Sequence, residues 1–227
     1  MEINADFTAP AFARTSQLDW VPSPMAGVDR RMLDRVGGEV ARATSIVRYA
    51  KGSAFAEHTH AGGEEFIVLE GVFQDEHGDY PAGTYVRNPV GTHHIPRSEP
   101  GCTIFVKLWQ FDPLDQEQIS VDLNAAALSS DPATPGVSRY VLAARDYENV
   151  ALEAWEPETG LALAHRGGLE VLVLAGSLIL DGVSYAAEDW IRIPAEEVVS
   201  MTSGEKGARL WIKRGHLKEI RVPSQVA

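Results

Sequence analysis

The chain of 227 residues has almost no cysteine, and Cys102 is the single one. One thiol excludes an intrachain disulfide and any site of the Cys-x-x-Cys type. Proteins without disulfides are typical of the reducing cytoplasm, so we expect a cytoplasmic protein. We expect Cys102 itself to be a small and inert core residue, because free cysteines are usually buried.

Basic residues are also scarce, with 20 Lys and Arg against 32 Asp and Glu and a formal net charge of −12. No basic run occurs, which excludes the clustered cations that bind phosphate backbones, so we expect no nucleic-acid partner. The chain lacks a long apolar run, and residues 1–6 are acidic, so we expect neither a membrane span nor a signal peptide. The 20 glycines and 13 prolines favour many turns between strands.

The residues that could bind a metal are concentrated in the segment 52–71, where a single residue separates two histidines. Residues i and i+2 of a strand point to the same face, so His58 and His60 present two imidazoles side by side. A Gly-Gly turn then brings the carboxylate of Glu64 back toward them, and His94 supplies a third imidazole. Three nitrogens and one oxygen are an ordinary ligand set for a first-row divalent metal.

The spacing of these residues resembles the two motifs of the cupin family. The first motif, with its Gly, His-x-His, Glu and Gly, lies at Gly52, His58, His60, Glu64 and Gly71. The second lies at Gly83, Pro89, Gly91 and His94, with Ser98 where the family has asparagine. The resemblance implies that the three histidines and Glu64 are metal ligands inside a small antiparallel β-barrel. It implies a divalent ion, with zinc expected first and iron, manganese or nickel as alternatives.

The second half of the chain repeats the first. A shift that carries Gly71 onto Gly176 also carries the Gly-Gly pair at 62–63 onto the pair at 167–168. We therefore expect an all-β protein of two tandem cupin barrels of the double-stranded β-helix, or jelly-roll, type. The expected parts are a metal-binding barrel at 1–111, a linker at 112–135 with a short helix at 125–127, and a second barrel at 136–227.

The second copy has lost the metal ligands. Leu163, Leu169 and Val199 stand where the first copy has His58, Glu64 and His94, and only His165 keeps a histidine. One imidazole among leucine and valine does not hold a divalent ion, so we expect one metal ion per chain. The second barrel would be a structural partner, or it would hold an organic ligand without metal.

Several other residues are open to two interpretations. Glu65 is a solvent-facing strand residue or an alternative ligand, and we favour the first. His93 should lie on the surface or, if the strand twists, at the pocket rim as a proton carrier. We expect His77 and His216 to be exposed turn residues. The tryptophans on strands are expected in the core, and three residues could line the first pocket: Arg48, Tyr49 and Tyr85.

A narrower resemblance is to the cupin domain of ChrR-type anti-sigma factors, which act on ECF sigma factors. It rests on residues 62–65, 68–73, 75–83 and 211–217, and it covers about 20 to 220. Those regulators begin with a helical sigma-binding domain that holds zinc through His and Cys. The residues before 40 contain neither residue type and are interrupted by prolines. We therefore expect no sigma-factor binding by this chain alone.

Three functions are compatible with these features. The first, which we favour over the second, is a ChrR-like sensing module of transcription regulation, which binds a metal and a small molecule or oxidant. The second is a metal-dependent dioxygenase or isomerase acting on a small organic substrate. The third is a structural metal site. Catalytic residues and the ligand stay unidentified at this stage, and a homodimer is compatible with the sequence.

Overall fold

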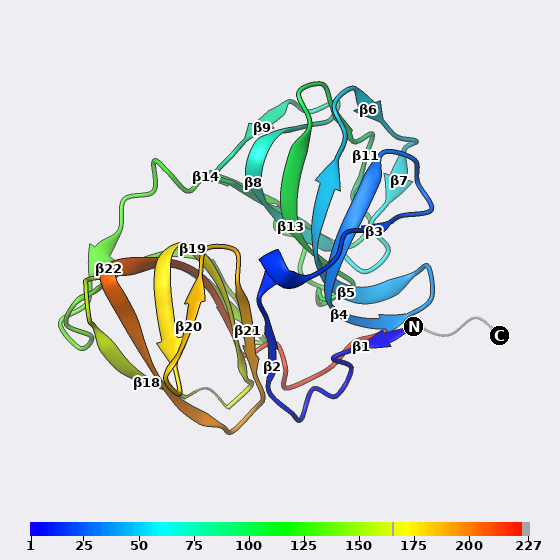
Figure 1. Ribbon diagram of the computed structural model, residues 1–227. Coiled ribbons are helices and arrows are strands. Elements are labelled where there is room, and N and C mark those ends of the chain that lie inside the picture. Colours follow the sequence, from blue (N-terminus) through cyan, green and yellow to red (C-terminus); the bar gives the residue numbers. More distant parts are fainter. Residues whose placement is uncertain (165, 224–227) are drawn as a thin grey trace. The chain divides into compact units, whose positions relative to one another are not determined.

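The computed structural model describes residues 1–164 and 166–223 (Figure 1). In these residues the regular structure is β-strand throughout, apart from one 3-10 turn, η1, at Thr15–Gln17. The expected all-β fold is confirmed. No helix among the described residues is long and apolar enough to cross a membrane.

The chain divides into two compact units. Unit 1 comprises residues 1–5, 19–125 and 221–223, and unit 2 comprises 6–18 and 126–220. The boundaries of unit 1 differ from those that we expected for the first barrel, residues 1–111, at both ends. Residues 6–18 belong to unit 2, and residues 112–125 belong to unit 1 and are not a free linker.

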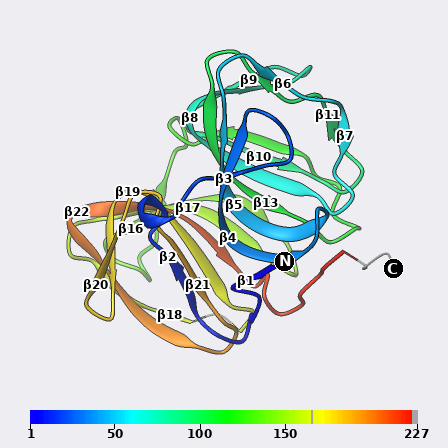
Figure 2. The same cartoon turned by 45° about the vertical axis from the view of Figure 1, so that its right-hand side comes forward.

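Unit 1 is built on one antiparallel sheet. Its main strands, in order across the sheet, are β1 (Glu2–Ile3), β4 (Val28–Gly37), β5 (Ala41–Tyr49), β13 (Cys102–Leu108), β8 (Glu64–Gln74), β10 (Thr84–Asn88) and β14 (Ile119–Asp122). Short strands complete the unit: β3 (Val21–Pro22), β6 (Ser53–Ala54), β7 (His58–Thr59), β9 (Asp79–Pro81), β11 (His93–His94) and β12 (Arg97–Ser98). Figure 2 shows β4, β5 and β13 side by side.

Strand alternation decides what lies inside unit 1. In β8, Phe66 and Val68 point to one face, and their partners on β13, Val106 and Ile104, point the same way. These four residues belong to one buried apolar cluster, which also contains Phe73. Glu64 is two residues before Phe66, so the same alternation carries its carboxylate to the inner face.

The expected helix at 125–127 is wrong. Residues 123–125 form a turn, and strand β14 precedes them within the segment that we expected to be a linker. β14 pairs with β10, with Val121 opposite Tyr85. Residues 126–128 have no regular structure, and three alanines are too short a run to nucleate a helix on their own.

Unit 2 repeats the strand order of unit 1. Its strands are β15 (Ser129–Ser130), β16 (Val137–Ala144), β17 (Asn149–Trp155), β22 (Val198–Arg214), β19 (Leu169–Leu180), β21 (Trp190–Ile193) and β2 (Ala11–Ala13), in order across the sheet. β18 (Gly160–Ala164) pairs with β22, and β20 (Val183–Ala186) pairs with β19. The N-terminal strand β2 thus forms an edge of unit 2, next to β21.

The repeat includes a shared backbone feature at the two glycines that the sequence aligns. Gly71 in β8 has φ +73° and Gly176 in β19 has φ +72°. A Cβ at Gly71 would collide with the carbonyl oxygen of Gly101, and one at Gly176 with that of Gly207. Each unit therefore requires glycine where this inner strand, β8 or β19, passes close to the backbone of its neighbour.

We predict that Gly71→Ala destabilises the protein far more than Gly52→Ala. Gly52 has φ +75° but open space around its Cβ position, so alanine there carries only the left-handed backbone cost, about 1–2 kcal/mol. At Gly71 a backbone collision is added, which costs about 1–3 kcal/mol more. Thermal and urea unfolding of the two variants would measure the difference, and equal destabilisation would contradict it.

Candidate metal centre

Two paired strands and one turn position the candidate ligands. In the β7–β11 pair, His94 lies opposite His58, and His60 follows directly after β7. The chain then turns at Gly62 and Gly63 and enters β8 at Glu64. The structure therefore brings together all four residues that the sequence singled out.

The turn exists because two aromatic rings lie against it. A side chain at Gly62 would collide with the ring of Trp109, and one at Gly63 would collide with Phe111. Gly63 also has φ +75°, a conformation that favours glycine. The turn can thus pass close under the rings and direct Glu64 toward the histidines.

The four donor atoms converge on one point. They all lie within 4.8 Å of one another. His60 Nε2 is 3.2 Å from His94 Nε2 and 3.3 Å from Glu64 Oε2, and His94 Nε2 is 3.8 Å from Glu64 Oε2. Ligands about 2.0–2.2 Å from a shared ion lie roughly 3 Å or slightly more from each other, so the spacing fits a metal ion.

The hydrogen bonds of His60 leave the correct nitrogen for a metal. Its Nδ1 lies 2.9 Å from Thr92 Oγ1, and that hydroxyl donates its own proton to the carbonyl oxygen of Pro89 at 2.7 Å. Thr92 Oγ1 can therefore only accept from His60, which places the ring proton on Nδ1. Nε2 then carries a lone pair directed into the cluster.

Asp75 is the corresponding partner of His94. Asp75 Oδ2 lies 3.4 Å from His94 Nδ1, an ion-pair distance that is long for a hydrogen bond. The other oxygen of Asp75, Oδ1, accepts from the backbone of His77 at 2.8 Å and from the Tyr80 hydroxyl at 3.3 Å. The carboxylate is fixed by these contacts and favours a His94 ring with its proton on Nδ1.

The two buried histidines have opposite pKa shifts. Burial lowers the pKa of His60, and the nearby carboxylate of Glu64 only partly offsets it. Burial also opposes the charged form of His94, but Asp75 and then Glu64 outweigh it and raise the pKa of His94. Without a metal ion the cluster therefore holds a proton at His94 in preference to His60.

The cluster borders a cavity of about 330 Å³, which we call the metal cavity. His58, His60 and Glu64 line it, and apolar side chains form most of the rest: Val28, Val47, Phe55, Val106, Leu108 and Trp109. Tyr49 also lines it, and burial raises the pKa of its phenol, so the hydroxyl stays neutral. The cavity can take an apolar molecule beside the ligand atoms.

Glu65 does not behave as we expected. It is buried, and its carboxylate accepts from the Tyr85 hydroxyl at 2.8 Å and lies 3.7 Å from Arg87. Because Glu65 follows Glu64 in β8, it points to the opposite face of the sheet. The expectation of a solvent-facing residue is wrong, and Glu65 is not part of the described metal cluster.

For the other residues that the sequence singled out, the structure agrees with the expected exposure in some cases and not in others. His93 is exposed beside Glu57, and His77 is exposed, as expected. His216 is not exposed, since its Nε2 lies 2.8 Å from a buried carboxylate oxygen of Glu170. Cys102 is buried, and burial raises the pKa of its thiol to about 11, which makes it an unreactive core residue.

Of the three residues that we expected near the first pocket, only Tyr49 lines the metal cavity. Tyr85 points to the face of Glu65, and Arg48 pairs with Asp29 at the surface. Sequence reasoning missed Asp75, Thr92 and also Asn88, whose amide lies 3.4 Å from Glu64 Oε2. Their contacts depend on how turns fold back on the histidines, and no local pattern reports that.

The equivalent region of unit 2 is apolar. Leu169 and Val199 are buried in the core cluster of the unit, and Leu163 packs against it. His165 lies outside the described residues. Among the described residues, the one group that could hold a metal ion is that of unit 1.

Comparisons with known proteins agree with this picture. Residues 8–112 match the sequence model of the ChrR Cupin-like domain family. No curated protein matches the chain.

Solved structures share the fold. A candidate dioxygenase from Nostoc punctiforme matches with a TM-score of 0.77 at 14% identity, over 97% of this chain and 88% of that one. A cupin 2 conserved barrel domain protein from Leptotrichia buccalis matches at 0.61 and 11% identity, over 86% and 92%. The pirin YhhW from Escherichia coli, in complex with nickel(II), matches at 0.61 and 14%, over 91% and 99%.

These identities support a shared fold and no more. The fold is nevertheless the one that the two sequence motifs imply, and the family match covers the part of the chain that carries the motifs. Residues 8–112 thus resemble a cupin-like family, and the chain shares its fold with solved cupin structures.

Proposed function

We propose that unit 1 is a metal-dependent centre that binds a small organic molecule. His58, His60, Glu64 and His94 would hold one divalent ion, and the ligand would occupy the metal cavity beside it. The observation that carries the proposal is that three of the four converging donor residues line a largely apolar cavity. A purely structural site is normally closed by its four ligands and needs no cavity.

The residues around the cluster suit this role. Thr92 and Asp75 fix the two buried imidazoles, so the ligand set is pre-organised before an ion arrives. The apolar wall excludes water from the bound molecule, and the neutral hydroxyl of Tyr49 offers it a hydrogen-bond donor. A bound divalent ion would supply Lewis-acid or one-electron chemistry there.

A sensing role of the ChrR type is the first use that we propose for this centre. Its support is the family match over residues 8–112 and the motif resemblance in the same segment. In that role, binding of the ligand changes the populations of two states of unit 1, and a partner protein reads the difference.

A metal-dependent enzyme is the second candidate. The specific observation in its favour is that half-buried Tyr49 lines the metal cavity, since its hydroxyl is a group that can donate a hydrogen bond to a reacting oxygen. The structural likeness to a candidate dioxygenase is in keeping with it. Oxygen consumption separates the two uses, because a sensor binds its ligand without turnover.

We predict one equivalent of metal per chain in the fully loaded protein. The double variant His58→Ala, His94→Ala should lose it, because half of the donor set is removed. His93→Ala is the matched control, since His93 adjoins His94 in sequence but is exposed and faces away. Elemental analysis gives the answer, and two equivalents, or an unchanged content in the double variant, would refute the assignment.

Metal affinity should fall as the pH is lowered. The histidines bind as neutral imidazoles, so protons compete near the ordinary histidine pKa of about 6.5. Because the pKa of His94 is raised, its competition begins at a higher pH than for a free imidazole. A titration from pH 7.5 to 4.5 with a chelator present should release the metal, and full retention at pH 4.5 would argue against three histidine ligands.

The cobalt(II)-loaded protein should reveal an open coordination position. Adding acetylacetone, a small β-diketone, should change the visible spectrum, because a ligand from the metal cavity would enter the coordination sphere. Before acetylacetone is added, the Tyr49→Phe variant should contain the same amount of cobalt and show the same visible spectrum as the parent protein. An unchanged spectrum at saturating acetylacetone would indicate a closed, structural site. Oxygen uptake by the iron(II)-loaded protein with the same compound would identify an enzyme.

A further inference from the structure

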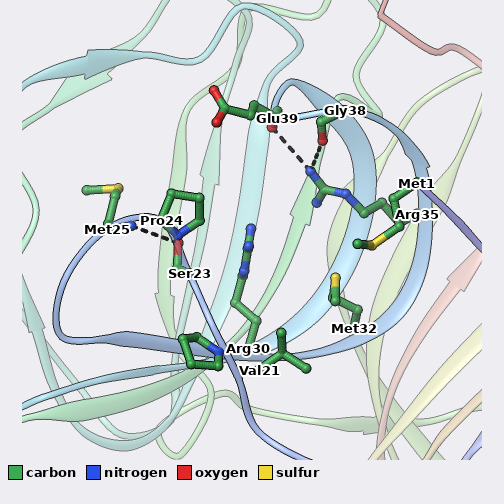
Figure 3. Close-up of a pocket in the computed structure, with 11 residues that line it drawn as sticks. Met1, Val21, Ser23, Pro24, Met25, Arg30, Met32, Arg35, Gly38 and Glu39 are labelled. Atoms are coloured by element: carbon green, nitrogen blue, oxygen red, sulfur yellow. Dashed lines mark hydrogen bonds between the residues drawn. The ribbon is translucent and has the colours of Figure 1, made fainter.

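A second cavity adjoins the metal cavity within unit 1. This outer chamber has a volume of about 820 Å³ and is drawn in Figure 3. Ser23, Met25, Arg30 and Glu39 line both cavities. The two cavities therefore share these residues as a common boundary, and Arg30 is the positively charged side chain in it.

Strand pairing directs Arg30 inward. Arg30 lies in β4 opposite Val47 of β5, and Val28, two residues earlier in β4, belongs to the inner apolar cluster. Alternation places Arg30 on the same face as Val28. In Figure 3 its side chain extends into the middle of the lining residues, with Pro24 on one side and Met32 on the other.

The guanidinium of Arg30 has no acidic partner among the described residues. Its Nε is buried and makes no hydrogen bond. Glu39 lines both cavities, but it is exposed and forms no ion pair with Arg30 within the described part of the chain. A cation that is partly removed from water and left unpaired is unfavourable, and an anion in the cavity would compensate it.

Arg35 strengthens the positive charge at this wall. It is buried, and its guanidinium donates to the carbonyl oxygens of Gly38 and Glu39, which are neutral groups. Burial lowers the pKa of Arg35, and the charge of Arg30 lowers it further, so the two cations are close enough to interact. Two arginines thus face the outer chamber, and within the described part of the chain neither forms an ion pair with Glu39, the carboxylate that lines it.

Most of the other side chains that line the outer chamber are apolar and adaptable. Val21, Pro22, Pro24, Met25 and Met32 line it, and Met25 is among the exposed large apolar side chains of the chain. Methionine side chains fill irregular gaps and accept ligands of different shape. An apolar surface with a cation at its junction matches an amphiphilic anion.

We propose that unit 1 binds an organic carboxylate with an apolar body, whose carboxylate pairs with Arg30 at the junction of the two cavities. The apolar body lies along the walls of the outer chamber and the metal cavity. The planar guanidinium fits a carboxylate with two parallel hydrogen bonds. The inference rests on the proposed function, because it names the class of molecule that would reach the metal site.

Octanoate and the neutral 1-octanol form a matched pair of probes, which differ in the charged group and share the apolar chain. Calorimetric titration of the zinc-loaded protein should give octanoate at least about tenfold tighter binding than 1-octanol. The Arg30→Gln variant should lose about tenfold in octanoate affinity, equivalent to about 1.4 kcal/mol, with 1-octanol unaffected. Arg30→Lys should fall between them, because it keeps the charge and loses the planar fork.

Arg48→Gln is the control, since Arg48 pairs with Asp29 at the surface and lines neither cavity. Its octanoate affinity should stay within about twofold of the parent, a change below 1 kcal/mol. Equal binding of the two probes, or octanoate binding unchanged in both Arg30 variants, would overturn the proposal. If Arg30→Gln does not fold, Arg30→Lys carries the comparison.

The same titration on metal-free protein separates this inference from the proposed function. Octanoate binding that depends on Arg30 but occurs in a protein unable to take up metal would support the carboxylate site and contradict the metal centre. Metal uptake with no preference for octanoate over 1-octanol would support the metal centre and contradict the carboxylate site.

Discussion

The candidate centre of unit 1 depends on the contact of two aromatic rings with a glycine pair. Trp109 lies against Gly62 and Phe111 lies against Gly63, and any side chain at either glycine would collide with a ring. This contact fixes the turn between β7 and β8. Because the turn is fixed, Glu64 enters the sheet on the face where the histidines converge, and the four donor atoms meet within 4.8 Å.

The two units show how one sheet order can support different interiors. β4, β5, β13, β8 and β10 of unit 1 correspond in order to β16, β17, β22, β19 and β21 of unit 2. Each unit retains a glycine with positive φ at the equivalent place of its inner strand, Gly71 in β8 and Gly176 in β19. Three of the four positions that hold polar ligands in unit 1 are leucine or valine in unit 2, where they join the apolar core or pack against it. The backbone frame thus does not require the polar cluster, which suits a functional role for it.

Much of this could be predicted from the sequence because the informative features are local. The His-x-His spacing and the glycines decide strand faces and turns over a few residues, so the all-β class and the meeting of the four side chains follow from them. The environment of Glu65 and His216 could not be predicted, because each is buried against a charged side chain that lies far away in the sequence. The pairing of β14 with β10 was missed for a similar reason, since a free sheet edge is a property of the folded unit and not of residues 119–122.

X-ray absorption spectroscopy of the metal-loaded protein tests the central claim most directly. The account predicts a first shell of nitrogen and oxygen donors at about 2.0–2.2 Å, with outer-shell scattering from three imidazole rings. It also predicts that scattering from one ring disappears in the His58→Ala variant. A sulfur donor at about 2.3 Å, or a shell with fewer than three imidazoles in the parent protein, would contradict the assignment of His58, His60, Glu64 and His94.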